Sequence, residues 1–203
     1  MRLFVSFGCG ILGWGGGLRA VKGIYEDSKL LGILGYLGEK KPGLEILCLF
    51  CVLTGVRVSD ALKLQKGSFR AAGELREGKT GKIKAWCIPS DLYGGFIAHS
   101  EAVARRGADL IFPYSRQLVH RWMRRAGVAV GLGGIGCHSM RKTYAWNVLR
   151  ASGCIYTVQA ALNHKYVSTT VLYLVDGVRW LMGEVYDSGP VVYPSFLVLQ
   201  NRE

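Results

Sequence analysis

The sequence predicts a mainly helical α+β domain with one small antiparallel sheet. Apolar residues recur at helical spacing along most of the chain, as they do in amphipathic helices that pack on a core. Residues 44–53 are apolar on nearly every side, which indicates a central buried helix rather than a membrane span. Between residues 68 and 88, two short strand-like runs flank a polar turn. These features together favour a helical domain that carries a single hairpin.

Helix breakers and capping residues set the expected boundaries of the elements. Gly38 is expected to end the first helix, and Gly55 to end the central helix in a left-handed cap. Ser59, Ser115 and Ser168 are each expected to cap the start of a helix. The expected order is helices over residues 26–37, 44–53, 59–64, 93–106, 115–125, 139–151, 155–162 and 168–174, strands over 68–70 and 83–88, and a glycine-rich linker over 127–136.

Composition narrows the class of partner and the compartment. The chain has 203 residues, half of them hydrophobic, which is enough for one domain with a substantial core. Its net charge of +12 favours a polyanionic partner, nucleic acid first and an acidic membrane surface second. Six cysteines without the spacing of a disulfide scaffold favour a reducing cytoplasm. Cys48 and Cys51 form a lone CxxC in the apolar run, so buried thiols are expected rather than a zinc site.

A set of cationic, imidazole and phenol side chains has the chemistry needed to break a DNA strand. Arginine forks can grip phosphate oxygens, lysine and histidine can move protons, and a tyrosine can attack phosphorus. His138 and Arg141 lie three residues apart near an expected helix start, so they share a face where the helix N-terminus favours an anion. The candidate site residues are Arg57, Lys79, His138, Arg141, His164 and Tyr173.

The local contexts of these residues resemble the tyrosine recombinase (phage integrase) family over residues 25–181. The motifs are Thr-Gly-Val-Arg ending at Arg57, Gly-Lys-Thr-Gly around Lys79, His-Ser-Met-Arg at 138–141, Leu-Asn-His ending at His164, and Thr-Thr-Val-Leu-Tyr ending at Tyr173. The steps of 23 residues from Arg141 to His164 and of nine to Tyr173 also match the family. Asp60 and Asn163 depart from it, because the family usually has Glu and Gly there.

The resemblance implies the DNA breaking–rejoining fold of the recombinase catalytic domain and a role for each residue. Tyr173 would attack the scissile phosphate and form a 3′-phosphotyrosyl bond, while Arg57 and Arg141 stabilise charge on the phosphate oxygens. His138 would act in proton transfer and His164 would support the phosphate by hydrogen bonding. Lys79 would be the general acid for the 5′-hydroxyl. It is favoured over Lys82 and Lys84 because Lys-Thr-Gly on this hairpin recurs in the family.

The resemblance also implies the partners and the organisation of the chain. Double-stranded DNA and a homo-oligomer on DNA, a tetramer, are expected, with no metal or other cofactor, no membrane association and a DNA-associated cytoplasmic location. Residues 1–24 are expected to be a glycine-rich extension, 25–181 the catalytic domain, and 182–203 an apolar tail. The tail either folds back on its own domain or, as the resemblance implies, is exchanged between subunits. The family usually carries a preceding core-binding domain, for which the residues before Arg57 leave no room. The chain is therefore expected to be a minimal recombinase, a truncated gene product, or a subunit helped by an accessory protein.

Three alternatives accompany this interpretation. Residues 73–80 match the phosphate-binding loop GxxxxGK[ST], but Gly81 and a strand-like run follow where a helix is required. Residues 8–13 match GxGxxG, but a glycine run follows where a helix is needed. The third alternative is a recombinase-like protein that binds DNA with little or no turnover.

Overall fold

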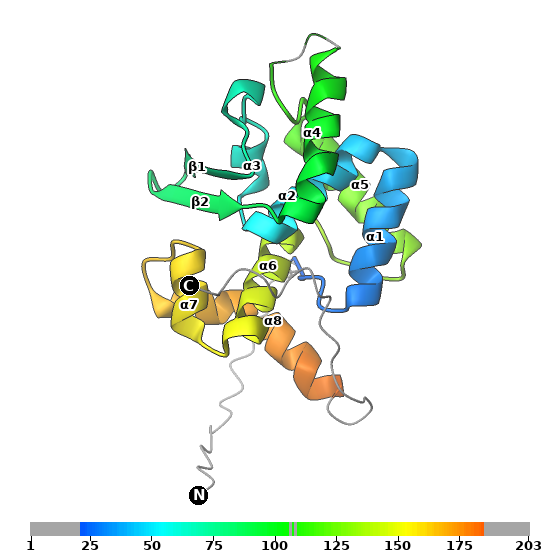
Figure 1. The fold of residues 1–203 in the computed structure, drawn as a ribbon. Helices are drawn as coiled ribbons and strands as arrows, with labels where there is room; N and C mark the ends of the chain where they lie inside the picture. Colours follow the sequence, from blue (N-terminus) through cyan, green and yellow to red (C-terminus); the bar gives the residue numbers. More distant parts are fainter. Residues whose placement is uncertain (1–20, 106, 108, 185–203) are drawn as a thin grey trace, which may run out of the picture.

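The structure is a computed structural model that describes residues 21–105, 107 and 109–184. The extension expected over residues 1–24, including the GxGxxG match at 8–13, and the tail expected over 182–203 lie almost wholly outside these residues. The elements, drawn in Figure 1, are α1 (Asp27–Lys40), α2 (Pro42–Thr54), α3 (Val58–Ala61), the 3-10 turn η1 (Lys66–Ser68), β1 (Ala72–Arg76), β2 (Ile83–Cys87), α4 (Ser90–Ala104), α5 (Arg116–Ala129), α6 (Cys137–Ser152), α7 (Ile155–Ala161) and α8 (Val167–Glu184). This architecture confirms the predicted mainly helical α+β class with a two-stranded antiparallel sheet.

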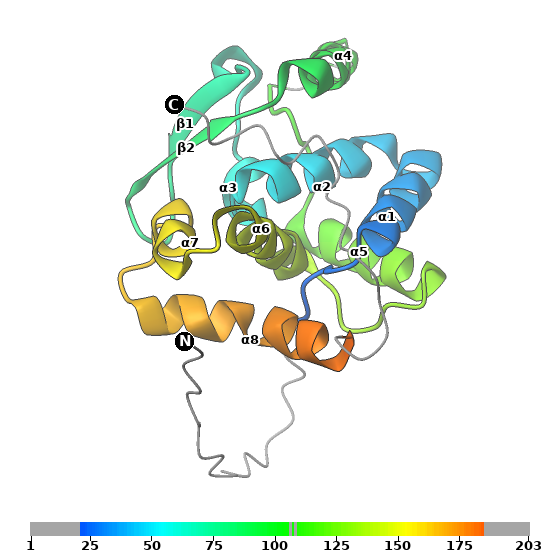
Figure 2. The same ribbon diagram turned by 60° about the horizontal axis from the view of Figure 1, so that its bottom comes forward.

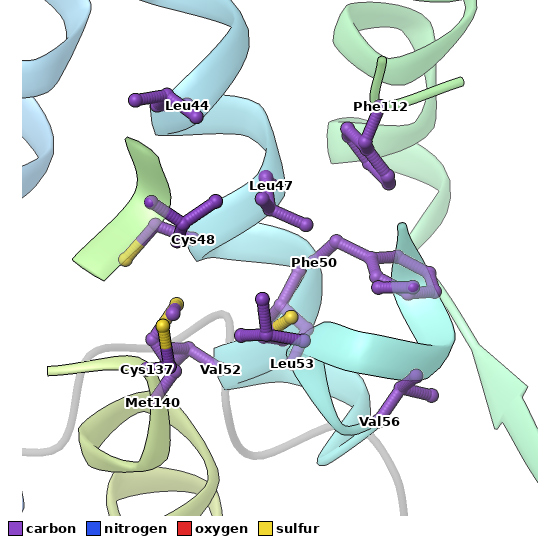
Figure 3. Close-up of a cluster of buried hydrophobic side chains, with 14 of the residues drawn as sticks. Leu44, Leu47, Cys48, Phe50, Val52, Leu53, Val56, Phe112, Cys137 and Met140 are labelled. Carbon is purple, nitrogen blue, oxygen red and sulfur yellow. The ribbon is translucent and has the colours of Figure 1, made fainter. Parts of the chain in front are cut away.

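Helix α2 forms the centre of the larger hydrophobic core. It packs against α1, α4 and α6, and most of its side chains are buried, as its largely apolar sequence predicts. Phe50 lies at the middle of an aromatic cluster, 5.7 Å from Trp86 and 5.8 Å from Phe112 between ring centroids. Figure 3 shows Phe50 and Phe112 together, with Cys48 among aliphatic side chains. Burial raises the pKa of Cys48 to about 12, so the CxxC holds inert, buried thiols as expected.

A smaller core joins the last three helices. Trp146 of α6, Leu162 after α7 and Leu174 of α8 are buried against one another, and Tyr25 meets Trp146 edge-on at 5.5 Å between ring centroids. In Figures 1 and 2 the β1–β2 hairpin lies next to α7, away from α1. Hydrogen bonds from β2 to the end of α7, described below, fix this neighbourhood. The fold therefore brings the hairpin, the start of α6 and the α7–α8 loop to one place.

Several helix boundaries differ from the prediction. Helix α1 passes through Gly38 and ends at Lys40, and the break falls at Lys41 (φ −153°), because Pro42 disfavours a helical residue before it and is well placed to start α2. Gly55 does end α2 in the left-handed conformation (φ 66°). Ser59 is not a cap, since α3 already begins at Val58.

The remaining corrections concern the sheet and the later helices. The predicted strand at residues 68–70 is wrong: η1 ends at Ser68, the next two residues belong to no helix or strand, and β1 begins at Ala72 opposite Cys87. Strand pairing decides this, because the turn closes with Glu77 N–H donating to Lys82 O (2.9 Å) and so sets the register. The Ser115 cap is confirmed, with Leu118 N–H donating to Ser115 Oγ (3.2 Å). α5 runs on to Ala129, and α4, α6 and α8 are all longer than predicted.

No helix among the described residues is both long and apolar enough to cross a bilayer.

Candidate active site

Arg57 is held at the rim of the core by the end of α2. Thr54 Oγ1 donates to Phe50 O (2.7 Å) and accepts from Val56 N–H (3.3 Å), which ties down the last turn. Gly55 packs directly under the ring of Tyr144, so any side chain there would collide with the ring as well as strain the left-handed backbone. Arg57 then follows in extended conformation with its side chain only 14% exposed.

Arg141 lies in the second turn of α6 and is almost completely buried, with 2% of its side chain exposed. Its guanidinium donates to Gly55 O (2.5 Å) and to Leu162 O (2.7 Å), carbonyls at the ends of two other helices. Burial, and then the charge of Arg57, lower the pKa of Arg141. Arg141 therefore joins three segments that are distant in the sequence, and it lies close to Arg57.

Glu77 is a member of this site that the sequence did not reveal. Its Oε1 pairs with Nη1 of Arg57 and with Nη1 of Arg141 (3.1 Å), while its Oε2 accepts from Thr80 Oγ1 (2.7 Å). Burial alone would raise the pKa of Glu77, but the two guanidiniums and Thr80 outweigh it and hold the pKa at about 2. The carboxylate is thus ionised at neutral pH, although only 1% of the side chain is exposed. One signal was present: Glu77 is the acidic residue beside Lys79 in an otherwise basic turn.

Tyr173 and His164 are in contact although they are nine positions apart in the sequence. The loop before α8 turns the chain, so the two rings pack edge-on with centroids 5.3 Å apart. His164 Nδ1 shares a hydrogen bond with the buried Thr170 Oγ1 (3.1 Å). Burial raises the pKa of Tyr173, opposed by the charges of Arg141 and Arg57. The same arginines add to burial in lowering the pKa of His164 to about 4, so His164 is neutral near pH 7.

Asn163 explains how this loop tolerates the departure from glycine. It adopts the left-handed conformation (φ 55°), which asparagine accepts more readily than most residues. Its side-chain Nδ2 donates to Ile83 O of β2 (2.8 Å), and Lys82 Nζ donates back to Asn163 O (3.1 Å). A glycine could not make the first of these bonds. Asn163 therefore ties the hairpin to the loop that carries His164.

His138 and Lys79 lie at the open side of the site. His138 is an exposed residue near the start of α6, although the protein shields part of its ring from water. This partial desolvation lowers the pKa of His138 first, followed by the charges of Arg116, Arg141, Arg57 and Lys79. Lys79 is exposed on the turn between β1 and β2, and within residues 21–184 as described it makes no hydrogen bond or ion pair. The structure thus gathers Arg57, Arg141, His164 and Tyr173 closely, places His138 at their edge, and leaves Lys79 reaching toward solvent.

Lys84 is a second buried charge that the sequence did not reveal. It is 5% exposed, its Nζ donates to Ala161 O (2.6 Å), and its ammonium lies 4.8 Å from the centre of the Tyr144 ring. Burial, together with the charge of Arg141, lowers the pKa of Lys84 to about 8. The alternation of β2 could have indicated this, since Lys84 shares its inward face with Trp86. The contacts of Lys84 are those of a residue that anchors the hairpin on α7.

A basic surface borders the site. The exposed face of α5 and one residue of α1 line an open depression, made of Tyr36, Arg116, Gln117, His120, Arg121, Arg124, Arg125, Val128 and Ala129. Arg116 at the start of α5 is close enough to His138 to lower the pKa of that imidazole. Because the arginines repeat along the helix, positive charge continues from the site along α5.

The hairpin also bears on the phosphate-binding-loop alternative. Lys79 and Thr80 lie on a tight turn between two antiparallel strands, with Gly81 in the left-handed conformation (φ 67°). A phosphate-binding loop of that class requires a helix beginning at the Lys-Thr pair. The structure therefore excludes that interpretation of residues 73–80.

Comparisons with known proteins agree with the geometry. Residues 29–176 match the model of the phage integrase family. A probable integrase/recombinase of Bacillus subtilis (strain 168), YoeC, is 27% identical over 166 residues, which cover 77% of this chain and 91% of that protein. Among solved structures, the XerA recombinase superposes with a TM-score of 0.65 at 19% identity, covering 83% of this chain and 67% of its own. A lambda integrase dimer bound to a core site gives 0.63 at 21% identity, covering 80% of this chain and 62% of its own, and these two likenesses establish the fold.

Proposed function

Because the chain belongs to the phage integrase family, we propose that it is a site-specific DNA recombinase that cleaves and rejoins duplex DNA through a 3′-phosphotyrosyl intermediate. The observation that carries the proposal is the position of Tyr173, a partly buried phenol that lies beside His164 and close to the charges of Arg57 and Arg141. Both arginine charges favour the phenolate, which is the form that attacks phosphorus. A tyrosine that served only to pack the core would stay neutral, and two nearby guanidiniums would not stabilise it.

The proposed reaction exchanges one phosphodiester for another. Tyr173 Oη attacks the scissile phosphorus, the bond to the 5′ oxygen breaks, and the phenolic proton passes to His138 at the open edge of the site. The 5′ oxygen leaves as a hydroxyl because it receives a proton from the ammonium of Lys79. A 5′-hydroxyl of a second strand then attacks the phosphotyrosine and releases Tyr173. Each step conserves the phosphodiester energy, so no nucleotide hydrolysis is needed.

Arg57 and Arg141 are the proposed clamp for the phosphate oxygens that do not react. Their guanidiniums already share one anion, the Glu77 carboxylate, so the space between them accepts a negatively charged group. The backbone acceptors Gly55 O and Leu162 O fix Arg141 from behind, which pre-orders the clamp before substrate arrives. Neutral His164 adds a hydrogen bond to the phosphate, with its orientation held by Thr170.

The test of the function works on a pool of sequences, so the target site is an outcome of the experiment. Nicked duplexes with randomised flanks are incubated with the protein, denatured, and the DNA that stays attached to protein is sequenced. A site-specific recombinase is expected to yield a covalent adduct enriched in one sequence, because the nick lets the released 5′ fragment diffuse away and traps the intermediate. Absence of any covalent adduct would contradict the proposal.

A second candidate function is supported by one specific observation. The clamp is filled by Glu77, and Arg141 is buried in the free protein, as would suit a relative that grips DNA without cleaving it. The same experiment separates the two functions. A protein that only binds would retain DNA under native conditions and lose all of it on denaturation.

Lys79 is the proposed general acid, and this assignment has a chemical test. Lys79→Ala is expected to slow cleavage about a hundredfold, within the usual range for general acid catalysis. A substrate with sulfur in place of the scissile 5′ oxygen is expected to restore the rate, because a thiolate leaves without a proton. Adduct formation on the two substrates measures this.

Lys84→Ala is the matched control, since Lys84 comes from the same hairpin but contacts Ala161 and Tyr144. Its loss is expected to lower the melting temperature, with no rescue by sulfur. If the sulfur substrate restored the rate of Lys84→Ala and not that of Lys79→Ala, the general acid would be Lys84 instead of Lys79.

Duplex DNA is the proposed partner of the basic face of α5. Arg121 and Arg124 are exposed and line its depression, so changing both to Gln is expected to leave folding intact. Removing one arginine–phosphate ion pair reduces the slope of log K against log salt by about 0.9, so a decrease of about 2 is expected for the double variant. Titrations at several salt concentrations measure the slope.

The double change Arg70→Gln with Arg105→Gln is the charge-matched control, because both residues are exposed outside this depression. If the slope of log K against log salt changed equally in the two double variants, the proposal that α5 binds DNA would be wrong. Assembly on DNA is proposed by analogy, since the structural neighbours include a lambda integrase dimer bound to a core site and a tetramer bound to a Holliday junction.

A further inference from the structure

We propose that Glu77 is a built-in substitute for the DNA phosphate: its carboxylate fills the anion site between Arg57 and Arg141 until a phosphate displaces it. This inference rests on the proposed function of the arginine pair, which it deepens by assigning a regulatory device to the same site. Displacement of Glu77 would release the turn that carries Lys79, so that entry of the substrate and delivery of the general acid are one event.

The contacts show that the site is occupied. Oε1 of Glu77 pairs with both guanidiniums, and Oε2 accepts from Thr80 Oγ1. The side chains of Glu77 and Arg141 are 1% and 2% exposed, so no second anion can reach Arg141 while the carboxylate stays. Two other acceptors of Arg141 are backbone carbonyls at packed helix ends. Glu77 is the partner that can leave, because it stands on a hairpin turn.

Charge explains why an anion is needed at all. Both guanidiniums contact the same oxygen of Glu77, so two positive charges lie close together and repel each other. The charge of Arg57 accordingly lowers the pKa of Arg141, after burial. One carboxylate relieves that repulsion, and a bound phosphate would relieve it equally. The two anions cannot share the site, because the carboxylate and the phosphate would repel each other just as the two guanidiniums do. Exchange of one anion for the other is therefore the arrangement that electrostatics favours.

The turn links this exchange to Lys79. Glu77 closes the turn through two backbone hydrogen bonds, its N–H to Lys82 O (2.9 Å) and Gly81 N–H to its carbonyl (2.8 Å). Thr80, next to Lys79, holds the carboxylate itself. Gly78 N–H donates to Asp60 Oδ1 (3.2 Å), a tether that does not depend on the arginines. When the Glu77 side chain leaves, the Asp60 tether keeps the turn near the site while Lys79 is freed to approach the leaving oxygen.

The first test follows phosphate binding without DNA. Glu77→Gln keeps the size of the side chain and removes its charge, and Glu74→Gln on the exposed face of β1 is the matched control. Melting temperatures are measured against inorganic phosphate, with chloride at equal ionic strength as the salt control. Glu77→Gln is expected to melt below the wild-type protein without phosphate, to recover as phosphate is added, and to bind phosphate about tenfold more tightly.

Three outcomes decide the inference. Equal phosphate affinity in Glu77→Gln and the wild-type protein would overturn it, as would an equal gain in Glu74→Gln. Should Glu77→Gln not fold, Thr80→Val replaces it, because that change removes only the hydroxyl that holds the carboxylate, and a smaller gain in phosphate affinity is expected. No gain in Thr80→Val would then overturn the inference.

The second test uses the nicked duplex. Adduct formation at saturating DNA is expected to be about tenfold faster in Glu77→Gln than in the wild-type protein, with no change in Glu74→Gln. Slower adduct formation would overturn the displacement mechanism and make Glu77 a positioning residue for the clamp. If no variant forms an adduct but Glu77→Gln still gains phosphate affinity, the anion exchange stands and the recombinase function fails, so the two failures are distinguishable.

Discussion

Tyr173→Phe is expected to abolish the covalent protein–DNA adduct while leaving DNA binding unchanged. The change removes the oxygen that we propose as the nucleophile, and the ring can still pack edge-on against His164. Loss of a nucleophile is expected to reduce cleavage by more than about a thousandfold. Adducts on the nicked duplex are measured on denaturing gels, in EDTA, because the proposed nucleophile and clamp are side chains of the protein itself.

Tyr166→Phe is the matched control. Tyr166 lies seven residues before Tyr173, immediately ahead of the same helix, but its ring is exposed and stacks with the ammonium of Lys165. It is expected to form adducts at the parental rate. Full adduct yield from Tyr173→Phe, or its loss in Tyr166→Phe, would refute the assignment of the nucleophile.

Arg141→Lys is expected to have the second largest effect, a loss of cleavage of about a hundredfold or more with most DNA affinity retained. An ammonium keeps the charge, which supplies the non-specific attraction to DNA, but it lacks the planar fork that grips two oxygens. In this protein the change is also expected to destabilise the fold. One ammonium cannot replace the bonds of Arg141 to Gly55 O, Leu162 O and Glu77 together, so the melting temperature is expected to fall as well.

A control variant separates the loss of cleavage in Arg141→Lys from its loss of stability. Arg116→Lys changes an exposed arginine at the start of α5. The charge of Arg116 lowers the pKa of His138, but Arg116 is not part of the proposed phosphate clamp. It is expected to cleave at nearly the parental rate. Denaturant unfolding of both variants shows how much of the defect comes from stability, and cleavage is compared below the unfolding transition. Parental cleavage by Arg141→Lys would remove Arg141 from the clamp.

Elements defined by local patterns could be predicted from the sequence, and elements defined by pairing could not. The central helix α2, its Gly55 cap and the Ser115 cap need only neighbouring residues, and the structure confirms all three. The strand expected at residues 68–70 failed because register is a property of two strands and the turn that joins them. Gly38 failed as a helix end because a proline four residues later sets the stop instead.

The residues of the candidate site also fall into those that local sequence motifs predict and those that only contacts between distant segments reveal. The sequence by itself determined which residues could carry the chemistry, since Arg57, Arg141, His164 and Tyr173 stand in short motifs whose spacing is visible in one dimension, and the fold brings these four together. Only the tertiary structure decided what surrounds them. Arg141 meets Glu77 across 64 positions, Lys84 reaches Ala161 across 77, and Asn163 binds Ile83 across 80. No local pattern encodes such contacts, because the charge that a buried carboxylate or ammonium meets depends on how distant segments pack, and packing alone made Glu77 the anion of the arginine pair.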